Sequence, residues 1–329
     1  MIMKRRDFFK GMAGAGVLVA TSQLPSFGQD LSLAAQDDPS VFPDRGRYER
    51  LSLTFATVEI GLEKPFSILH ISDTHLTAAY PYENAKKQKL HTTRTRTFGG
   101  HQEEALRDSL AWAREKVDYV LHTGDLIDWQ SEANFDLVRK YFGDNMTGCM
   151  GNHEFSPDMG FSEPKETPTE GFKDLSREAL SKAYPFDISF SSQVVNGVNF
   201  IMIDDVYGTV TPEQVSRFRA EAAKGLPMVL CMHVPFYTPG IWRATKRFWQ
   251  NKDCKFSDGK VPAPSGAWRR QQEDPVTRDF IACLREEPLL KAILAGHEHI
   301  TVQDRFSETA MEYVVSGNFL FAGQEVLFV

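Results

Sequence analysis

Short apolar runs that end in polar residues recur along the chain. The clearest covers residues 66–71 and is followed directly by Ser72-Asp73. The same change from apolar to polar occurs over residues 119–125, 228–233 and 292–297. Runs of this length, bounded by polar residues, predict buried strands that deliver polar side chains at their carboxyl ends.

Helical patterns lie between these runs. One helix face is marked by apolar residues at 3.6-residue spacing, namely Leu106, Leu110, Ala113 and Val117. Thr211-Pro212 with Gln214 predicts a helix start, in which Thr211 is the N-cap and Gln214 completes a capping box. Asn196-Gly197 predicts a tight hairpin. Alternating strands and helices predict a layered α/β fold, in which ligands bind at the carboxyl ends of strands.

The first residues have a different character from the rest of the chain. Arg5-Arg6 precede a mildly apolar run over residues 11–20, and Ser26-Phe27-Gly28 offers a small-residue cleavage site. This segment resembles a twin-arginine signal peptide, and its apolar run is too short to anchor the mature protein in a membrane. We expect a signal peptide over residues 1–29, a linker over 30–47 and one domain over 48–329. The alternative is a basic tail of a cytosolic protein.

Composition narrows the classes of partner. The 329-residue chain is 42% hydrophobic and has a formal net charge of -7, so no basic face is expected to wrap nucleic acid. Nucleic acid is therefore expected only as a substrate. The four cysteines lack the paired spacing of a structural zinc site. In an oxidising compartment Cys254 and Cys283 could pair, but four cysteines allow three full pairings and the sequence does not choose among them.

Five polar segments carry the candidate chemistry. In chain order they are Asp73-Thr74-His75, Gly124-Asp125, Gly151-Asn152-His153-Glu154, His233 and Gly296-His297-Glu298-His299. Imidazole, carboxylate and amide oxygen are ligands for borderline divalent ions, and six or seven of them exceed what one ion uses. Two ions are therefore expected. We expect the glycines to permit sharp turns at the strand ends.

In this order the five segments resemble the calcineurin-like metallophosphoesterase superfamily, from about residue 68 to residue 318. The resemblance implies an α/β sandwich of two mixed β-sheets flanked by α-helices, formed by a single domain with a long inserted loop. It also implies how the ligands divide between the ions. The first ion would take Asp73, His75 and His299, the second Asn152, His233 and His297, with Asp125 bridging both.

The implied activity is hydrolysis of a small-molecule phosphate monoester or diester by a hydroxide held between two divalent ions, Mn, Fe or Zn. His153 is the predicted general acid, and Glu154 is predicted to orient or polarise it. Asp128 stands where purple acid phosphatases carry a tyrosine ligand, so an iron-tyrosinate site is not expected. The signal peptide predicts export by the twin-arginine machinery, and hence a periplasmic or secreted enzyme.

Two basic stretches follow ligand segments and should lie over the site. For residues 76–101 the alternatives of a substrate-facing segment and a solvated loop stay open. Residues 237–275 contain Trp242, Trp249 and Trp268 among arginines, and we interpret them as a substrate-facing lid.

His70 and His122 lie inside apolar runs and are interpreted as core residues. The alternative functions are an extracytoplasmic nuclease and a non-catalytic protein that binds metal or phosphate.

Overall fold

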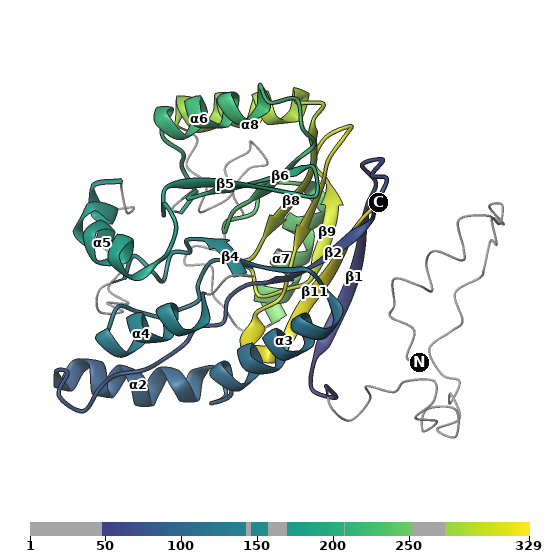
Figure 1. Ribbon diagram of the computed structural model, residues 1–329. Coiled ribbons are helices and arrows are strands. Elements are labelled where there is room, and N and C mark those ends of the chain that lie inside the picture. Colours follow the sequence, from purple (N-terminus) through teal and green to yellow (C-terminus); the bar gives the residue numbers. More distant parts are fainter. Residues whose placement is uncertain (1–47, 143–145, 157–169, 207, 252–273) are drawn as a thin grey trace, which may run out of the picture. The chain divides into compact units, whose positions relative to one another are not determined.

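The computed structural model shown in Figure 1 describes residues 48–142, 146–156, 170–206, 208–251 and 274–329. The predicted signal peptide (1–29) and linker (30–47) lie outside the described residues, so their boundaries stay predictions. The chain divides into two units, residues 1–50 and 51–329. All the helices and strands that the structure describes belong to the second unit.

The first β-sheet has five strands in the order β1-β11-β2-β3-β4. The strands β2, β3 and β4 are parallel, β11 is antiparallel to β2, and β1 is parallel to β11, so the sheet is mixed. Their bounds are β1 Ser52–Val58, β2 Phe66–Ile71, β3 Tyr119–Thr123, β4 Met146–Cys149 and β11 Ala322–Phe328.

The second β-sheet has six strands in the order β5-β6-β7-β8-β10-β9. The four central strands are parallel, and β5 and β9 run antiparallel at the two edges. The bounds are β5 Phe190–Val195, β6 Val198–Ile203, β7 Met228–Cys231, β8 Leu290–Ala295, β9 Val302–Arg305 and β10 Met311–Val314.

Helices flank the two sheets, and Figure 1 shows α6 and α8 side by side on one outer face and α2, α3 and α4 on the opposite one. The predicted fold of two mixed sheets with flanking helices is therefore confirmed. The bounds are α2 Ala85–Thr97, α3 Gln102–Lys116, α4 Glu132–Tyr141, α5 Glu170–Ala183, α6 Pro212–Ala222, α7 Pro239–Asn251, α8 Pro275–Glu286 and the 3-10 helix η2 Asn318–Leu320.

The main core lies between the two sheets. Ile68 and Leu121 of the first sheet belong to one buried cluster with Phe200 and Leu294 of the second. A second cluster covers the outer face of the six-stranded sheet, where Phe218 of α6 meets Phe280 of α8 with ring centroids 5.2 Å apart. Burial of this apolar surface is the main driving force for stacking the layers.

The local predictions agree with the structure. Each of the four apolar runs contains a strand, and α3 covers the predicted apolar helix face up to its C-cap at Val117. Both hydrogen bonds of the Thr211–Gln214 capping box are present. Asn196 and Gly197 have φ angles of 49° and 84°, which is the left-handed geometry of a type I′ hairpin between β5 and β6.

In the residues that the structure describes, both basic stretches contain a helix. Residues 76–101 contain α2, and the stretch that starts at residue 237 begins with α7. Ile241 and Thr245 lie four residues apart and are both buried, and α7 contacts the edge strand β9. Residues 252–273, which include Trp268, Arg269 and Arg270, lie outside the described residues, so the lid interpretation stays a prediction.

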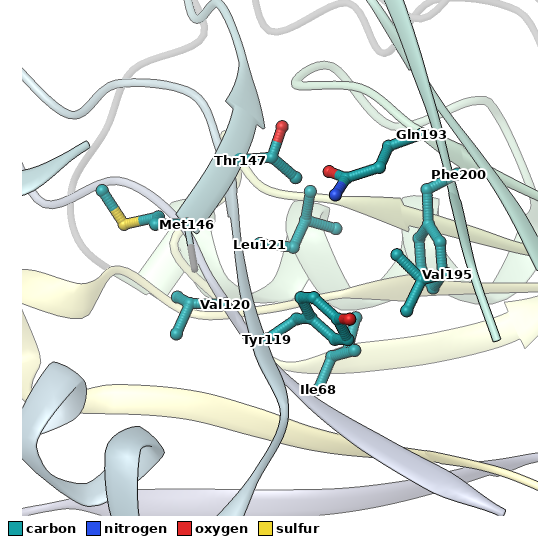
Figure 2. A pocket seen from close by; sticks show the side chains of 9 residues that line it. All are labelled: Ile68, Tyr119, Val120, Leu121, Met146, Thr147, Gln193, Val195 and Phe200. Atoms are coloured by element: carbon teal, nitrogen blue, oxygen red, sulfur yellow. The ribbon is translucent and has the colours of Figure 1, made fainter. Parts of the chain in front are cut away.

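A small, mostly apolar pocket lies between the sheets, and Figure 2 shows the nine side chains that line it. Tyr119 and Met146, at the starts of β3 and β4, are among them, as are Val195 and Phe200 from either side of the hairpin turn. The pocket is therefore at the end of these strands away from the polar segments. In the part of the chain that the structure describes, no helix has the length and apolarity to cross a membrane.

Candidate active site

The seven proposed ligands follow strands of both sheets. Asp73 comes two residues after β2, Asp125 two after β3 and Asn152 three after β4 in the first sheet. His233 and His297 each come two residues after β7 and β8 in the second. Because these strands run parallel within each sheet, their carboxyl ends bring the ligand segments to one edge of the sandwich.

The first group of side chains is Asp73, His75 and His299. Nε2 of His299 lies 3.3 Å from Oδ1 of Asp73, and Nε2 of His75 lies 3.8 Å from the same oxygen. The two Nε2 atoms are 3.2 Å apart. These are the three residues expected to hold the first ion.

The second group is Asp125, His233 and His297. Nε2 of His233 lies 3.3 Å from Oδ2 of Asp125 and 3.1 Å from Nδ1 of His297. The other ring nitrogen of His233 is 2.7 Å from the carbonyl oxygen of Thr123, so its Nδ1–H donates there and Nε2 is the nitrogen that faces this group.

Asp125 joins the two groups. Its Oδ2 lies 3.3 Å from Nε2 of His233 in the second group and 3.8 Å from Nε2 of His75 in the first. Its Oδ1 accepts a hydrogen bond from the His153 amide at 2.8 Å, which fixes the orientation of the carboxylate. One oxygen of Asp125 therefore faces both groups, as a bridging ligand requires.

The donor set fits two divalent ions. Oδ1 of Asn152 is buried and has no hydrogen-bond partner among the described residues, and an oxygen left in this way needs a cation or a donor. Pairs of ring nitrogens from two histidines face one another in both groups, an arrangement that a shared cation would stabilise. Asp125, His233 and His297 can hold one ion, for which Asn152 is the proposed further ligand, and Asp73, His75 and His299 can hold the other.

The backbone at the ligands is strained, which the sequence did not reveal. Five proposed ligands have positive φ angles between 52° and 69°, namely Asp73, His75, Asp125, His297 and His299. Residues with a side chain rarely adopt this region, and such strain is concentrated at functional sites. The turns are held by backbone hydrogen bonds, such as Asp73 N–H to Gly124 O and His75 N–H to Asp125 O, each 2.9 Å long.

The glycines beside the ligands serve two purposes. Gly124 has φ +92°, so it makes the predicted sharp turn after β3. Gly151 and Gly296 do not have this conformation. A Cβ atom on Gly151 would stand 2.2 Å from Oδ1 of Asp125, and one on Gly296 would stand 2.6 Å from Oδ2 of Asp73. These two glycines therefore also allow close approach of the ligand carboxylates, beside turns that begin at the next residue.

The charges around the ligands favour a cation. Burial would lower the pKa of His233, but the nearby Asp125 carboxylate raises it to about 10. The same negative charge that favours an imidazolium there would also favour a divalent ion. Burial and the neighbouring His153 lower the pKa of His75, which keeps that ring in the neutral form that binds metals.

Asp128 organises the side of the site next to the first group. Its Oδ1 lies 2.9 Å from Nδ1 of His153, 3.0 Å from Nδ1 of His75 and 2.8 Å from the Arg94 guanidinium. The side chain is fully buried, and burial alone would raise its pKa, but Arg94 and His153 lower it well below the usual range. Asp128 is thus an anion that orients both a proposed ligand and the predicted general acid.

His153 has one ring nitrogen on Asp128 and the other facing the ligands. Its Nε2 lies 3.9 Å from Oδ2 of Asp125, and the side chain is 17% exposed. Burial would lower the pKa of His153, but the Asp125 and Asp128 carboxylates raise it to about 9. These two carboxylates therefore favour the protonated imidazole, whose Nε2 faces the proposed ligands.

Glu154 has other partners than the predicted one. Its carboxylate is fully buried and accepts hydrogen bonds of 2.7–3.3 Å from the amides of Gly151, Asp125, Leu126 and Ile127 and from the Tyr184 hydroxyl. These contacts hold the Asp125 turn against the Gly151 turn. The predicted orientation of His153 by Glu154 does not match this geometry, since the carboxylate beside the His153 ring is that of Asp128.

Two neighbours of the ligands were not predicted individually from the sequence. Arg94 and Phe98 come from the basic stretch 76–101, and Phe98 stacks on His75 with ring centroids 4.2 Å apart.

His70 and His122 are buried as expected, and their Nε2 atoms lie 2.9 Å from the hydroxyls of Thr123 and Thr74. Cys149 and Cys231 are buried as well, and burial raises the pKa of both thiols.

A family model described as calcineurin-like phosphoesterase matches residues 66–301. The chain therefore belongs to the calcineurin-like phosphoesterase family, and it is a metal-dependent hydrolase of phosphoric ester bonds. The match contains all seven proposed ligands together with His153. Comparison with curated proteins gives no match.

Solved structures with a similar fold are distant in sequence. A dimetal phosphatase from Danio rerio is 16% identical over 79% of this chain and 91% of its own, with a TM-score of 0.46. PhoD is 12% identical over 79% of this chain and 57% of its own, with a TM-score of 0.47. A 5′-nucleotidase from Candida albicans is 11% identical over 82% and 47%, with a TM-score of 0.38.

Proposed function

We propose that this protein hydrolyses small-molecule phosphate esters with two divalent ions, the first held by Asp73, His75 and His299 and the second by Asn152, His233 and His297, with Asp125 shared. The observation that carries the proposal is that Oδ2 of Asp125 faces His75 on one side and His233 on the other. When bound, two such ions supply Lewis acidity that activates water and neutralises charge on the phosphate oxygens.

The chain itself supplies the proton for the leaving group. His153 keeps Nδ1 on the Asp128 carboxylate, so its Nε2–H is free to donate to the departing ester oxygen. Asp128 stabilises the imidazolium before the transfer and holds the ring in place after it. Arg94 in turn fixes Asp128 through two guanidinium nitrogens, with one on each carboxylate oxygen.

The test is hydrolysis of a chromogenic monoester and a chromogenic diester by protein loaded with Mn, Fe or Zn, alongside metal-free protein. We expect turnover that requires metal, with about two ions per chain by elemental analysis. Binding of two ions without turnover of any ester would instead support the non-catalytic alternative. Elemental analysis of protein from its native host would identify the metals, since the ligand types suit all three.

We also propose that the enzyme acts outside the cytoplasm, in the periplasm or as a secreted protein. This rests on Arg5-Arg6 and the apolar run after them, which lie outside the described residues. Replacing both arginines with lysine should leave unprocessed precursor inside the cell, because the twin-arginine machinery reads that pair. Normal processing and export of the double variant would contradict the proposal.

A further inference from the structure

An aromatic side chain that the proposed chemistry does not use lies against the first ligand group. The ring of Phe319 in η2 meets the His299 ring edge-on with centroids 5.2 Å apart, and the His75 ring with centroids 5.9 Å apart. The Phe319 ring also packs against the Phe98 ring, with centroids 4.8 Å apart. Phe319 is half-buried, so part of an apolar ring is exposed beside the first ligand group.

The backbone fixes the place of Phe319. The Asn318 amide donates to Ser72 O at 2.7 Å, which ties η2 to the turn that carries Asp73. The buried Asn318 side chain donates to Ser109 Oγ at 2.9 Å, and its Oδ1 accepts from Thr74 Oγ1 at 3.2 Å. A segment held in this way is organised before any ligand arrives, so little conformational entropy is lost when one binds.

The Phe319 ring packs closely against Gly317. A Cβ atom at this position would stand 2.3 Å from Cε1 of Phe319. The absence of a side chain at residue 317 thus leaves the space that the Phe319 ring occupies beside His299.

The charged group that packs on the Phe98 ring is already engaged. The Arg94 guanidinium lies 4.8 Å from the centre of the Phe98 ring and forms hydrogen bonds to Asp128. Phe98 is itself buried, so the exposed part of the Phe319 ring is the surface suited to an apolar group, which gains free energy by covering it.

We propose that Phe319 is the floor of a substituent subsite, which binds an aromatic or branched apolar group of the phosphate ester while the phosphate lies at the dimetal site. The inference rests on the proposed function for the position of the phosphate. It makes esters with apolar substituents the preferred substrate class, in contrast to esters of small or strongly polar alcohols.

The test compares two non-hydrolysable ligands, 2-phenylethylphosphonate and ethylphosphonate, by calorimetric titration of the Mn-loaded protein. We expect 2-phenylethylphosphonate to bind about 10-fold more tightly than ethylphosphonate, or tighter still. Phe319→Ala should bring the ratio of the two affinities close to one. The matched control is Phe55→Ala, which removes an exposed phenylalanine from the edge strand β1 and should preserve the ratio. Equal affinities in the wild type, or an unchanged ratio in Phe319→Ala, would overturn the inference.

Metal content is measured in each variant because Phe319 contacts two proposed ligands. If Phe319→Ala binds fewer than two ions, the ratio of the two phosphonate affinities is measured in Phe319→Leu instead, because leucine keeps an aliphatic group against His75 and His299. A ratio below that of the wild type supports the inference, and an unchanged ratio overturns it.

Hydrolysis of the matching esters separates this inference from the proposed function. The leaving groups of 2-phenylethyl phosphate and ethyl phosphate have similar basicity, so a difference in kcat/KM reports contact with the substituent. Selective phosphonate binding without hydrolysis of either ester would contradict the proposed function and keep the subsite. Hydrolysis of both esters with equal phosphonate binding would keep the proposed function and remove the subsite.

Discussion

Nδ1 of His153 lies 2.9 Å from Oδ1 of Asp128, and the two residues enter the site from the turns after β4 and β3. The same oxygen of Asp128 lies 3.0 Å from Nδ1 of His75. One buried carboxylate therefore couples the position of the predicted general acid to that of a proposed metal ligand. The consequences of this coupling, and of the bridging position of Asp125, can be measured.

Asp125→Ala should abolish both metal binding and activity, because Asp125 is the one proposed ligand that faces both groups. Metal content by elemental analysis and turnover of a chromogenic ester should fall together. Asp136→Ala, which removes a half-exposed aspartate on α4, is the matched control and should leave both unchanged. Two ions per chain and near-normal turnover in Asp125→Ala would rule out the bridging assignment.

His153→Ala should retain two ions and slow turnover by about 10²–10⁴-fold, the usual range for loss of a positioned general acid. The loss should be smaller for esters with good leaving groups, because these depart without a proton. The measurement is kcat for a series of aryl and alkyl phosphates, with metal content determined in parallel. An equal loss on all esters would instead indicate that His153 binds the substrate.

Asp128→Asn should move the basic limb of the pH–rate profile to lower pH. The Asp128 carboxylate helps to raise the pKa of His153 to about 9, and a neutral amide removes that contribution. His153 must carry a proton to act as an acid, so a lower pKa means that activity is lost at lower pH. The expected displacement is about 1 pH unit or more, measured on kcat of the metal-loaded enzyme. An unchanged basic limb would show that another group controls it.

Glu154→Ala should destabilise the protein by about 3 kcal/mol or more, because it leaves several buried amide groups without an acceptor. Chemical unfolding of the metal-free protein gives the free energy of unfolding directly. Glu178→Ala, at a glutamate that is 85% exposed on α5, is the control and should change it by less than about 0.5 kcal/mol. If Glu154→Ala unfolds like the wild type and yet turns over slowly, Glu154 has the catalytic role predicted from the sequence.

The sequence by itself determined the layered α/β fold and the set of seven proposed ligands. The apolar runs locate the strands because buried strands need continuous apolar side chains, and the polar residues that follow must then lie at the strand ends. The capping box at Thr211 and the hairpin at Asn196-Gly197 are equally local, since each is fixed by a few adjacent residues. Such features are readable without knowing what packs against them.

Only the tertiary structure decided which side chains surround the ligands. Asp128, Arg94 and Phe319 lie on three separate segments of the sequence. Nothing in the sequence shows that Asp128 pairs with Arg94 or that Phe319 lies against His75 and His299. For Glu154, adjacency in sequence suggested a contact that the fold does not make. Its place beside His153 suggested an orienting role, but its carboxylate accepts hydrogen bonds from the amides of the Asp125 turn. The proposed ligand set follows from the resemblance of five sequence segments to a known family, but the contacts that orient these residues depend on how distant segments pack.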